Sequence, residues 1–178
     1  MRKLSFEEIQ ISRDRSRPIA KIPITVVADN IRSLHNIGAL FRTADGANIE
    51  KLYLCGISGT PPRNEIRKTS LGAEESVPWE YTADARTVID TLSFKGYQIV
   101  VLEHTTQSQD YRTAPYRFPL CLIIGHEFHG VQDELVGMAD LAIEIPMYGI
   151  KQSLNVSVAF GIAIYELLSH LKGGDALR

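Results

Sequence analysis

The sequence has 178 residues, of which 44% are hydrophobic, 22% charged and 8% aromatic, so collagen-like, coiled-coil and disordered classes are excluded. This length suits one domain with short appendages. The net charge of −2 argues against a generally basic nucleic-acid binder, but residues 1–70 carry 12 basic and 7 acidic side chains, while residues 71–178 carry 7 and 14. We therefore expect a polyanion to bind the front half of the chain.

The segment from Met1 to Glu8 has no apolar stretch of the secretory type, so we expect a cytoplasmic protein. The longest uncharged apolar run, residues 153–165, is too short to cross a bilayer as a helix, and we expect no membrane span. Cys55 and Cys121 each lie inside an apolar run, which indicates buried, reduced thiols and not a disulfide or a metal site.

Three regions divide the chain. A charged stretch without periodicity predicts an irregular, basic N-terminal arm over residues 1–22. One domain is expected over residues 23–172, followed by a short tail over residues 173–178.

Strands and helices alternate along the predicted domain. The β-branched run Ile24–Ala28 predicts a strand buried on both faces, and apolar residues at three-to-four spacing from Ile37 predict a helix that closes around Gly46. The segment Gly56–Ala73 has no period and predicts a long loop. The other predicted strands or extended pieces are Lys51–Cys55, Pro78–Thr82, Tyr97–Leu102, Leu120–Ile124 and Ala142–Ile145, and the other helices are Ala85–Phe94, Gln132–Ala139 and Leu154–Leu171. This alternation predicts an α/β sandwich with a mainly parallel sheet.

The first candidate motif opens the first helix. Asn36, Gly38, Ala39 and Arg42 come directly after a strand, so their helix begins at the edge of the sheet. A guanidinium there can bind a phosphate through two parallel hydrogen bonds. The alternative is that Asn36 only caps the helix and that Arg42 is an ordinary solvated residue.

The second motif, Gly125-His126-Glu127-Phe128-His129-Gly130, follows the strand Leu120–Ile124. Its glycines either let a ligand approach the backbone or form a structural turn. A glutamate stands where the dinucleotide fingerprint needs its middle glycine. The two histidines lack the spacing of a helical zinc site, so we expect no metal.

The third motif runs from Ser153 to Ala159 into the last helix. Ser153 or Asn155 can cap that helix and present polar groups at its positive end. Apolar residues at helical spacing from Val156 onward predict a stripe that is buried in the core or in an interface.

Together and in this order, the three motifs resemble those of the SpoU (TrmH) family of RNA ribose 2′-O-methyltransferases, in the SPOUT superfamily. The resemblance covers residues 23–171, and the third motif is the most specific. It implies an α/β fold with a C-terminal deep trefoil knot, S-adenosylmethionine bound by the knot loops, and sites completed across a homodimer. By position, the implied cofactor-binding residues are Leu102, Glu103, Gly125, Ile145, Met147 and Leu154, and the implied catalytic residues are Asn36, Arg42, Glu127, Ser153 and Asn155.

The resemblance implies in-line attack of a ribose 2′-hydroxyl on a sulfonium methyl group. A guanidinium is a poor base, so we expect Arg42 to clamp a neighbouring phosphate and the developing alkoxide, with the proton passing to phosphate or water. Ser153 and Asn155 are expected to position the ribose and the methionine end, and Glu127 to orient Arg42 or Asn36. The family more often has a small or amide residue in place of the histidine of the second motif.

Some relatives select their RNA with a separate N-terminal domain or a C-terminal extension, and we expect neither here. We therefore expect RNA to be selected by the dimer partner and by basic residues, namely Arg13, Arg15, Arg17, Arg63, Arg67 and Lys68. The alternative is that these charges form ordinary solvated surface. A minimal chain suits a compact substrate, which favours tRNA over ribosomal RNA. Two rival functions are a non-catalytic RNA-binding or ribosome-associated module with the same fold, and a nucleotide-binding α/β protein.

Overall fold

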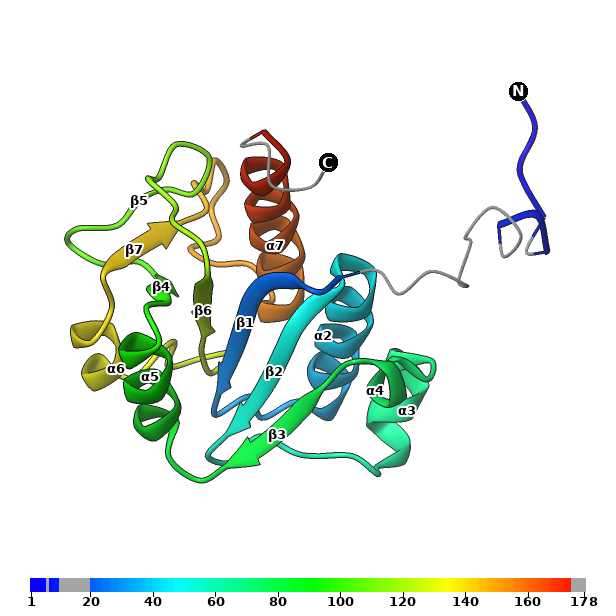
Figure 1. Ribbon diagram of the computed structural model, residues 1–178, viewed down its shortest axis with the longest axis horizontal. Coiled ribbons are helices and arrows are strands. Elements are labelled where there is room, and N and C mark those ends of the chain that lie inside the picture. Colours follow the sequence, from blue (N-terminus) through cyan, green and yellow to red (C-terminus); the bar gives the residue numbers. More distant parts are fainter. Residues whose placement is uncertain (6, 10–19, 174–178) are drawn as a thin grey trace.

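A computed structural model describes residues 1–5, 7–9 and 20–173 and shows a central sheet with helices on both faces (Figure 1). Every strand pair among these residues is parallel, and the strand order is β3-β2-β1-β6-β4-β7-β5. The strands are β1 (Ile22–Asp29), β2 (Ile49–Cys55), β3 (Trp79–Thr82), β4 (Gln98–Leu102), β5 (Gln109–Asp110), β6 (Leu120–Ile124) and β7 (Leu141–Glu144). The predicted α/β class with a parallel sheet is confirmed.

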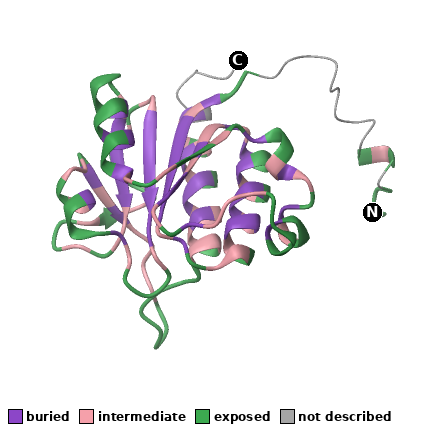
Figure 2. Cartoon of the chain, turned by 90° about the horizontal axis from the view of Figure 1, so that it is seen from below, coloured by how far each residue is buried: buried purple, intermediate pink, exposed green. Residues whose placement is uncertain are grey.

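The helices form two outer layers. They are α2 (Leu34–Ala47), α3 (Asn64–Ser70), α4 (Ala73–Ser76), α5 (Ala85–Phe94), α6 (Asp133–Gly137) and α7 (Val156–Gly173). The buried residues of α2 and α7 belong to one hydrophobic core, and those of α5 and α6 belong to a second. The sheet therefore separates two cores, and Figure 2 shows its buried strands between helices whose outer faces are exposed.

Alternation along each strand sorts side chains between the two cores. In β1, Val26 packs toward α2 and α7, whereas Val27 packs toward α5 and α6. In β6, Leu122 and Ile123 are divided in the same way. Because both faces of the sheet are covered, the central strands are apolar at nearly every position. This is why short, continuous apolar runs in the sequence mark them.

Most predicted elements are confirmed within two residues at each end, and α5 and β6 have the predicted bounds. The last helix begins at Val156 and not at Leu154. The two-residue strand β5 was not predicted, because so short a segment has no hydrophobic pattern.

The prediction of a continuous loop over Gly56–Ala73 is wrong, because this segment contains α3 and the first residue of α4. Only Ile66 and Ser70 of α3 are buried, which is too few positions to reveal a helical period. The helix packs closely on α2 at Gly38, where an added Cβ would lie 2.0 Å from the Thr69 hydroxyl oxygen. This close contact between the helices stabilises a short helix that its sequence alone does not mark.

Several other predictions concern burial and the chain ends. Cys55 and Cys121 are both buried and unpaired, as expected, and burial raises the pKa of Cys55 to about 12. Arg13, Arg15 and Arg17 of the predicted arm lie outside the described residues. Among the helices that the structure describes, none has both the length and the apolar character needed to cross a membrane.

Candidate active site

The three sequence motifs meet at one edge of the sheet. The carboxyl ends of parallel strands lie along a common edge, where ligands of α/β proteins usually bind. Asn36 stands in the first turn of α2, which follows β1. Glu127 follows β6, and Asn155 directly precedes α7. Segments far apart in the sequence are thus brought together by the topology.

A hydrogen-bond network joins one residue from each motif. The side-chain amide of Asn36 donates to Glu127 Oε1 at 2.8 Å, and the amide of Asn155 donates to Asn36 Oδ1 at 3.1 Å. The backbone N–H groups of Arg32 and Ser33 also donate to the Glu127 carboxylate, at 3.0 and 2.9 Å. Three of the five candidate catalytic residues, Asn36, Glu127 and Asn155, are therefore directly connected.

The environment of Glu127 keeps its carboxylate ionised. Partial burial acts to raise its pKa, but hydrogen bonds from the Ser33 backbone and the Asn36 side chain outweigh burial and leave the pKa below its ordinary value. Because its oxygens already accept three N–H donors, the carboxylate is suited to orienting Asn36 and the backbone before α2.

The sequence left open whether Asn36 caps α2 and which residue caps α7, and the structure answers both questions. Asn36 is not the N-cap of α2, because Ser33 holds that position and accepts a hydrogen bond from the Asn36 backbone. At α7, the Asn155 side chain accepts from the Ser157 backbone N–H at 2.9 Å and so caps the helix. The side chain of Asn36 is consequently available for Glu127 and Asn155.

Two candidate catalytic residues lie outside this network. Arg42 is exposed and makes no hydrogen bond or ion pair with a described residue. It follows Asn36 by six positions on α2, which corresponds to about 9 Å along a helix axis. Ser153 lies on the exposed loop between β7 and α7 and lines the cavity described next.

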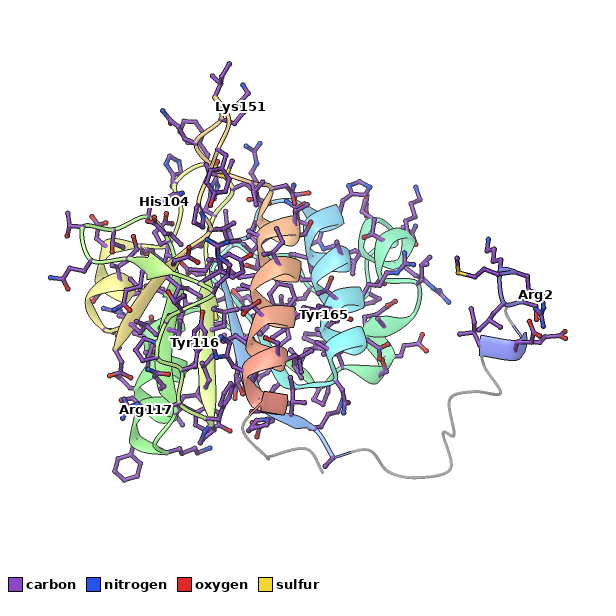
Figure 3. All side chains as sticks on the ribbon, turned by 90° about the horizontal axis from the view of Figure 1, so that it is seen from above. Arg2, His104, Tyr116, Arg117, Lys151 and Tyr165 are labelled. Carbon is purple, nitrogen blue, oxygen red and sulfur yellow. The ribbon has the colours of Figure 1, made fainter. Side chains whose placement is uncertain are left out.

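A cavity of ≈ 230 Å³ opens beside the network. The structure brings all six candidate cofactor-binding residues to its walls, namely Leu102, Glu103, Gly125, Ile145, Met147 and Leu154. Glu127 and Ser153 line it as well. Figure 3 shows Lys151 at the outer tip of the loop between β7 and α7, with His104, another lining residue, nearer to the sheet.

Two glycines allow the loop after β6 to pack tightly. A Cβ on Gly125 would lie 2.3 Å from backbone atoms of Gly130 and Val131, so no side chain fits there. Gly130 has a φ of +70° and lies against the carboxylate of Glu103. That carboxylate accepts hydrogen bonds from the backbone of Val131 at 2.9 Å and of His104 at 2.8 Å. Glu103 therefore holds the loop as well as lining the cavity.

Sequence reasoning missed the structural role of His126. Its Nδ1 atom accepts hydrogen bonds from the backbone N–H groups of Phe128 and His129, at 3.0 and 3.3 Å. These bonds fold the loop that carries Glu127. The nearby Ser157 was also missed, and its hydroxyl donates to Asn155 Oδ1 at 2.6 Å. A serine two positions after a capping asparagine is the only signal that the sequence offered.

The remaining candidate RNA-binding residues lie away from the cavity. Arg63 is the N-cap residue of α3, and Arg67 and Lys68 lie in its last turn. All three are exposed.

Comparisons with known proteins identify the family of the chain. The model of the SpoU rRNA Methylase family matches residues 23–165. A relative from Aquifex aeolicus (strain VF5), named tRNA (guanosine(18)-2′-O)-methyltransferase, is 37% identical over 146 residues, which cover 80% of this chain and 67% of the relative. The chain spans roughly two thirds of the length of such curated relatives.

Solved structures show the same fold. The A. aeolicus TrmH/SpoU tRNA modifying enzyme matches with a TM-score of 0.79 and 33% identity, over 87% of this chain and 78% of that one. The AdoMet-bound rRNA methyltransferase from Sinorhizobium meliloti has the same TM-score and 31% identity, over 88% of this chain and 60% of that one. The family match, these identities and the shared fold together establish that the chain belongs to the SpoU methylase family.

Proposed function

We propose that this protein transfers the methyl group of S-adenosylmethionine (AdoMet) to a ribose 2′-hydroxyl of tRNA. The observation that carries the proposal is the network of Glu127, Asn36 and Asn155, which joins the three motifs and contains one residue, Glu127, that lines the cavity. The name of the A. aeolicus relative, a tRNA 2′-O-methyltransferase, supports both the reaction and the choice of tRNA over ribosomal RNA.

The chemistry of the cavity fits AdoMet. Leu102, Ile145 and Met147 offer apolar walls for an adenine ring, with backbone groups between them. The carboxylates of Glu103 and Glu144 supply negative charge for a ligand that carries a sulfonium and an ammonium group. When bound, AdoMet supplies an electrophilic methyl group. The AdoMet in the matched S. meliloti structure supports this assignment.

The polar residues have distinct proposed tasks. Glu127 holds the amide of Asn36, which in turn holds Asn155, so that Asn155 and Ser153 position the ribose. Arg42 clamps the neighbouring phosphate and the alkoxide that develops at the 2′-oxygen. The 2′-hydroxyl proton passes to phosphate or water, because the Glu127 oxygens are already engaged by N–H donors.

A homodimer explains how the distant Arg42 reaches a reacting group. Helix α7 buries one apolar face and leaves a second one open, with Val158 51% and Tyr165 55% exposed. The Tyr165 hydroxyl would lie 3.1 Å from a Cβ on Gly46, so this face adjoins α2, and Arg42 is one helical turn before Gly46. Figure 3 shows Tyr165 on α7 beside α2. We propose that a second copy covers this face and receives Arg42 in its own site.

The order of the last elements supports the proposed trefoil knot. The chain leaves β7, which lies on one side of β6, and returns in α7 to pack on α2. Residues 145–155 therefore cross the carboxyl ends of the central strands beside the loop over residues 125–131. We propose that this crossing threads the chain through a loop within the domain over residues 23–172.

Arg63, Arg67 and Lys68 are proposed to hold the RNA backbone, since their positively charged side chains are exposed. The basic arm over residues 1–22 is proposed to contribute further positive charge to RNA binding.

The decisive test incubates the protein with radiolabelled AdoMet and separate pools of unmodified tRNA and ribosomal RNA. We expect label at a ribose of tRNA, located by nuclease digestion and mass spectrometry, and no label with Arg42→Ala. AdoMet binding without transfer to either pool would contradict the proposed reaction and favour a non-catalytic RNA-binding module.

A further inference from the structure

A second cavity lies between α3, α4 and β3 and shares no lining residue with the candidate active site. Its volume of ≈ 340 Å³ is within the range of about 300–1,000 Å³ that is usual for ligand sites. Figure 1 shows these three elements at the end of the sheet opposite β7. The residues that matter below are Arg63, Arg67, Glu74, Glu75 and Trp79.

Trp79 supplies a fixed aromatic wall to this cavity. It is partly buried, and its ring meets the ring of Phe41 edge to face, with centroids 6.1 Å apart and an interplanar angle of 84°. Phe41 is fully buried, so the tryptophan is held from behind. A rigid aromatic ring at a cavity wall is a stacking platform for an unpaired nucleobase.

The charged groups of the cavity differ in whether they are engaged. The Ser70 hydroxyl donates to the Glu74 carboxylate, and Arg67 lies close enough to Glu74 to interact with it electrostatically. In contrast, the side chains of Arg63 and Glu75 make no hydrogen bond or ion pair within the described part of the chain. One guanidinium and one carboxylate are therefore available to a ligand.

We propose that this cavity binds an unpaired guanine nucleotide of the RNA substrate, at a position other than the methylated one. The base stacks on Trp79, and its phosphate is bound by Arg63. Guanine fits best because its N1–H and N2 amino groups are adjacent donors, which match the two oxygens of the Glu75 carboxylate. Adenine presents an acceptor at N1 and would leave that carboxylate badly paired. The inference rests on the proposed function only in taking RNA as the substrate.

Trp79 is the single tryptophan of the chain, so the intrinsic tryptophan fluorescence comes from the wall of this cavity alone. The chain of 178 residues, without AdoMet, is titrated with the trinucleotides UGU, UIU and UAU, where I is inosine, while the tryptophan fluorescence is recorded. We expect quenching by UGU, an affinity for UAU about tenfold lower, and an intermediate affinity for UIU, which lacks the N2 amino group.

Matched variants distinguish recognition of the guanine base from a general effect of charge on affinity. Glu75→Gln should remove the preference for UGU over UAU, whereas Glu65→Gln, an equal charge change on α3 outside the cavity, should keep it. Arg63→Ala should weaken all three trinucleotides alike. Arg117→Ala, at the side of the molecule opposite α3 in Figure 3, should weaken none.

The inference is overturned if no trinucleotide quenches the fluorescence, if UGU and UAU bind equally, or if Glu75→Gln keeps the preference. The titration involves no methyl transfer, so its failure leaves the proposed reaction standing. Conversely, a guanine preference without any label transfer would contradict the proposed methyl transfer but support guanine binding in this cavity.

Discussion

The Glu127 carboxylate acts on two segments at once. Its oxygens fix the backbone before α2 through Arg32 and Ser33, and they fix the side-chain amide of Asn36. The side-chain oxygen of Asn36 then accepts a hydrogen bond from the amide of Asn155. One ionised group thus sets the orientation of two amides, so its charge matters more than its size.

Glu127→Gln tests this role. The glutamine has the shape of glutamate, but one of its two acceptor oxygens is replaced by an NH₂ group that cannot accept a hydrogen bond. At least one of the N–H donors that face Glu127 then loses its acceptor, and the alignment of Asn36 and Asn155 is lost. We expect kcat for methyl transfer to fall roughly 100-fold, as for other small misplacements of reacting groups. The measurement is the initial rate of label transfer. Glu134→Gln, which removes a surface carboxylate paired with Arg86, is the matched control and should retain the wild-type rate.

The pH dependence of stability provides an independent test. The pKa of Glu127 is lower in the folded protein than in the unfolded chain, where glutamate titrates at about 4.3. Its contribution to stability is complete above that pH and is lost as the pH falls through the lower folded-state pKa. The difference in unfolding free energy between wild type and Glu127→Gln should shrink in acid. Urea titrations at several pH values measure it, and a difference that grows in acid would contradict the assignment.

At the scale of elements, α2 and α3 depend on one residue without a side chain. A Cβ on Gly38 would lie 2.0 Å from the Thr69 hydroxyl oxygen and 2.3 Å from the Ile66 carbonyl oxygen. The hydroxyl can rotate away, but the carbonyl belongs to the backbone of α3. Any side chain at this position must therefore push the helices apart.

We expect Gly38→Ala to lower the free energy of unfolding by roughly 1–3 kcal/mol, as for other overpacked sites. Chemical denaturation followed by circular dichroism measures this loss. Gly137→Ala is the control, because nothing lies within 4 Å of an added Cβ there, and it should be neutral or stabilising. Equal effects of the two variants would show that helix contact is not the cause.

Helix α7 is apolar on two sides, although only one side faces the core. Phe160 and Ile164 are fully buried, whereas Val158 and Tyr165 are exposed. Val158→Asp should leave the fold intact and convert a dimer into a monomer, because a partner would have to bury the new charge. Analytical ultracentrifugation measures the mass of each species. Ser93→Asp, at an exposed position of α5 on the opposite face of the sheet, should remain dimeric, and a monomeric wild type would refute the proposed interface.

At the scale of the whole molecule, burial decides which elements the sequence reveals. The strand β6 is buried at every position, and α5 buries one face, so both have clear patterns and their bounds were predicted correctly. Helix α3 was missed because its packing depends on a glycine in another helix.

Only part of the candidate site could be predicted from the sequence. Asn36 and Asn155 could be selected from the sequence because each is part of a polar motif where a helix begins, although helix capping was an equally simple interpretation of either residue. The backbone donors of Arg32 and Ser33 have no side-chain signature, and they lie 95 and 94 positions before Glu127 in the sequence. The role of His126 likewise arises from the fold of its own loop, which residue spacing does not specify.

The bond between Asn36 and Asn155 joins residues 119 positions apart, and this separation has a consequence for protein synthesis. The N-terminal part of a chain emerges first from the ribosome, so α2 and most of the strands are synthesised well before Asn155 is added. Until then Asn36 can be held by Glu127 alone. A nascent chain therefore cannot assemble the complete network, and the timing of translation keeps it inactive until its last helix is made.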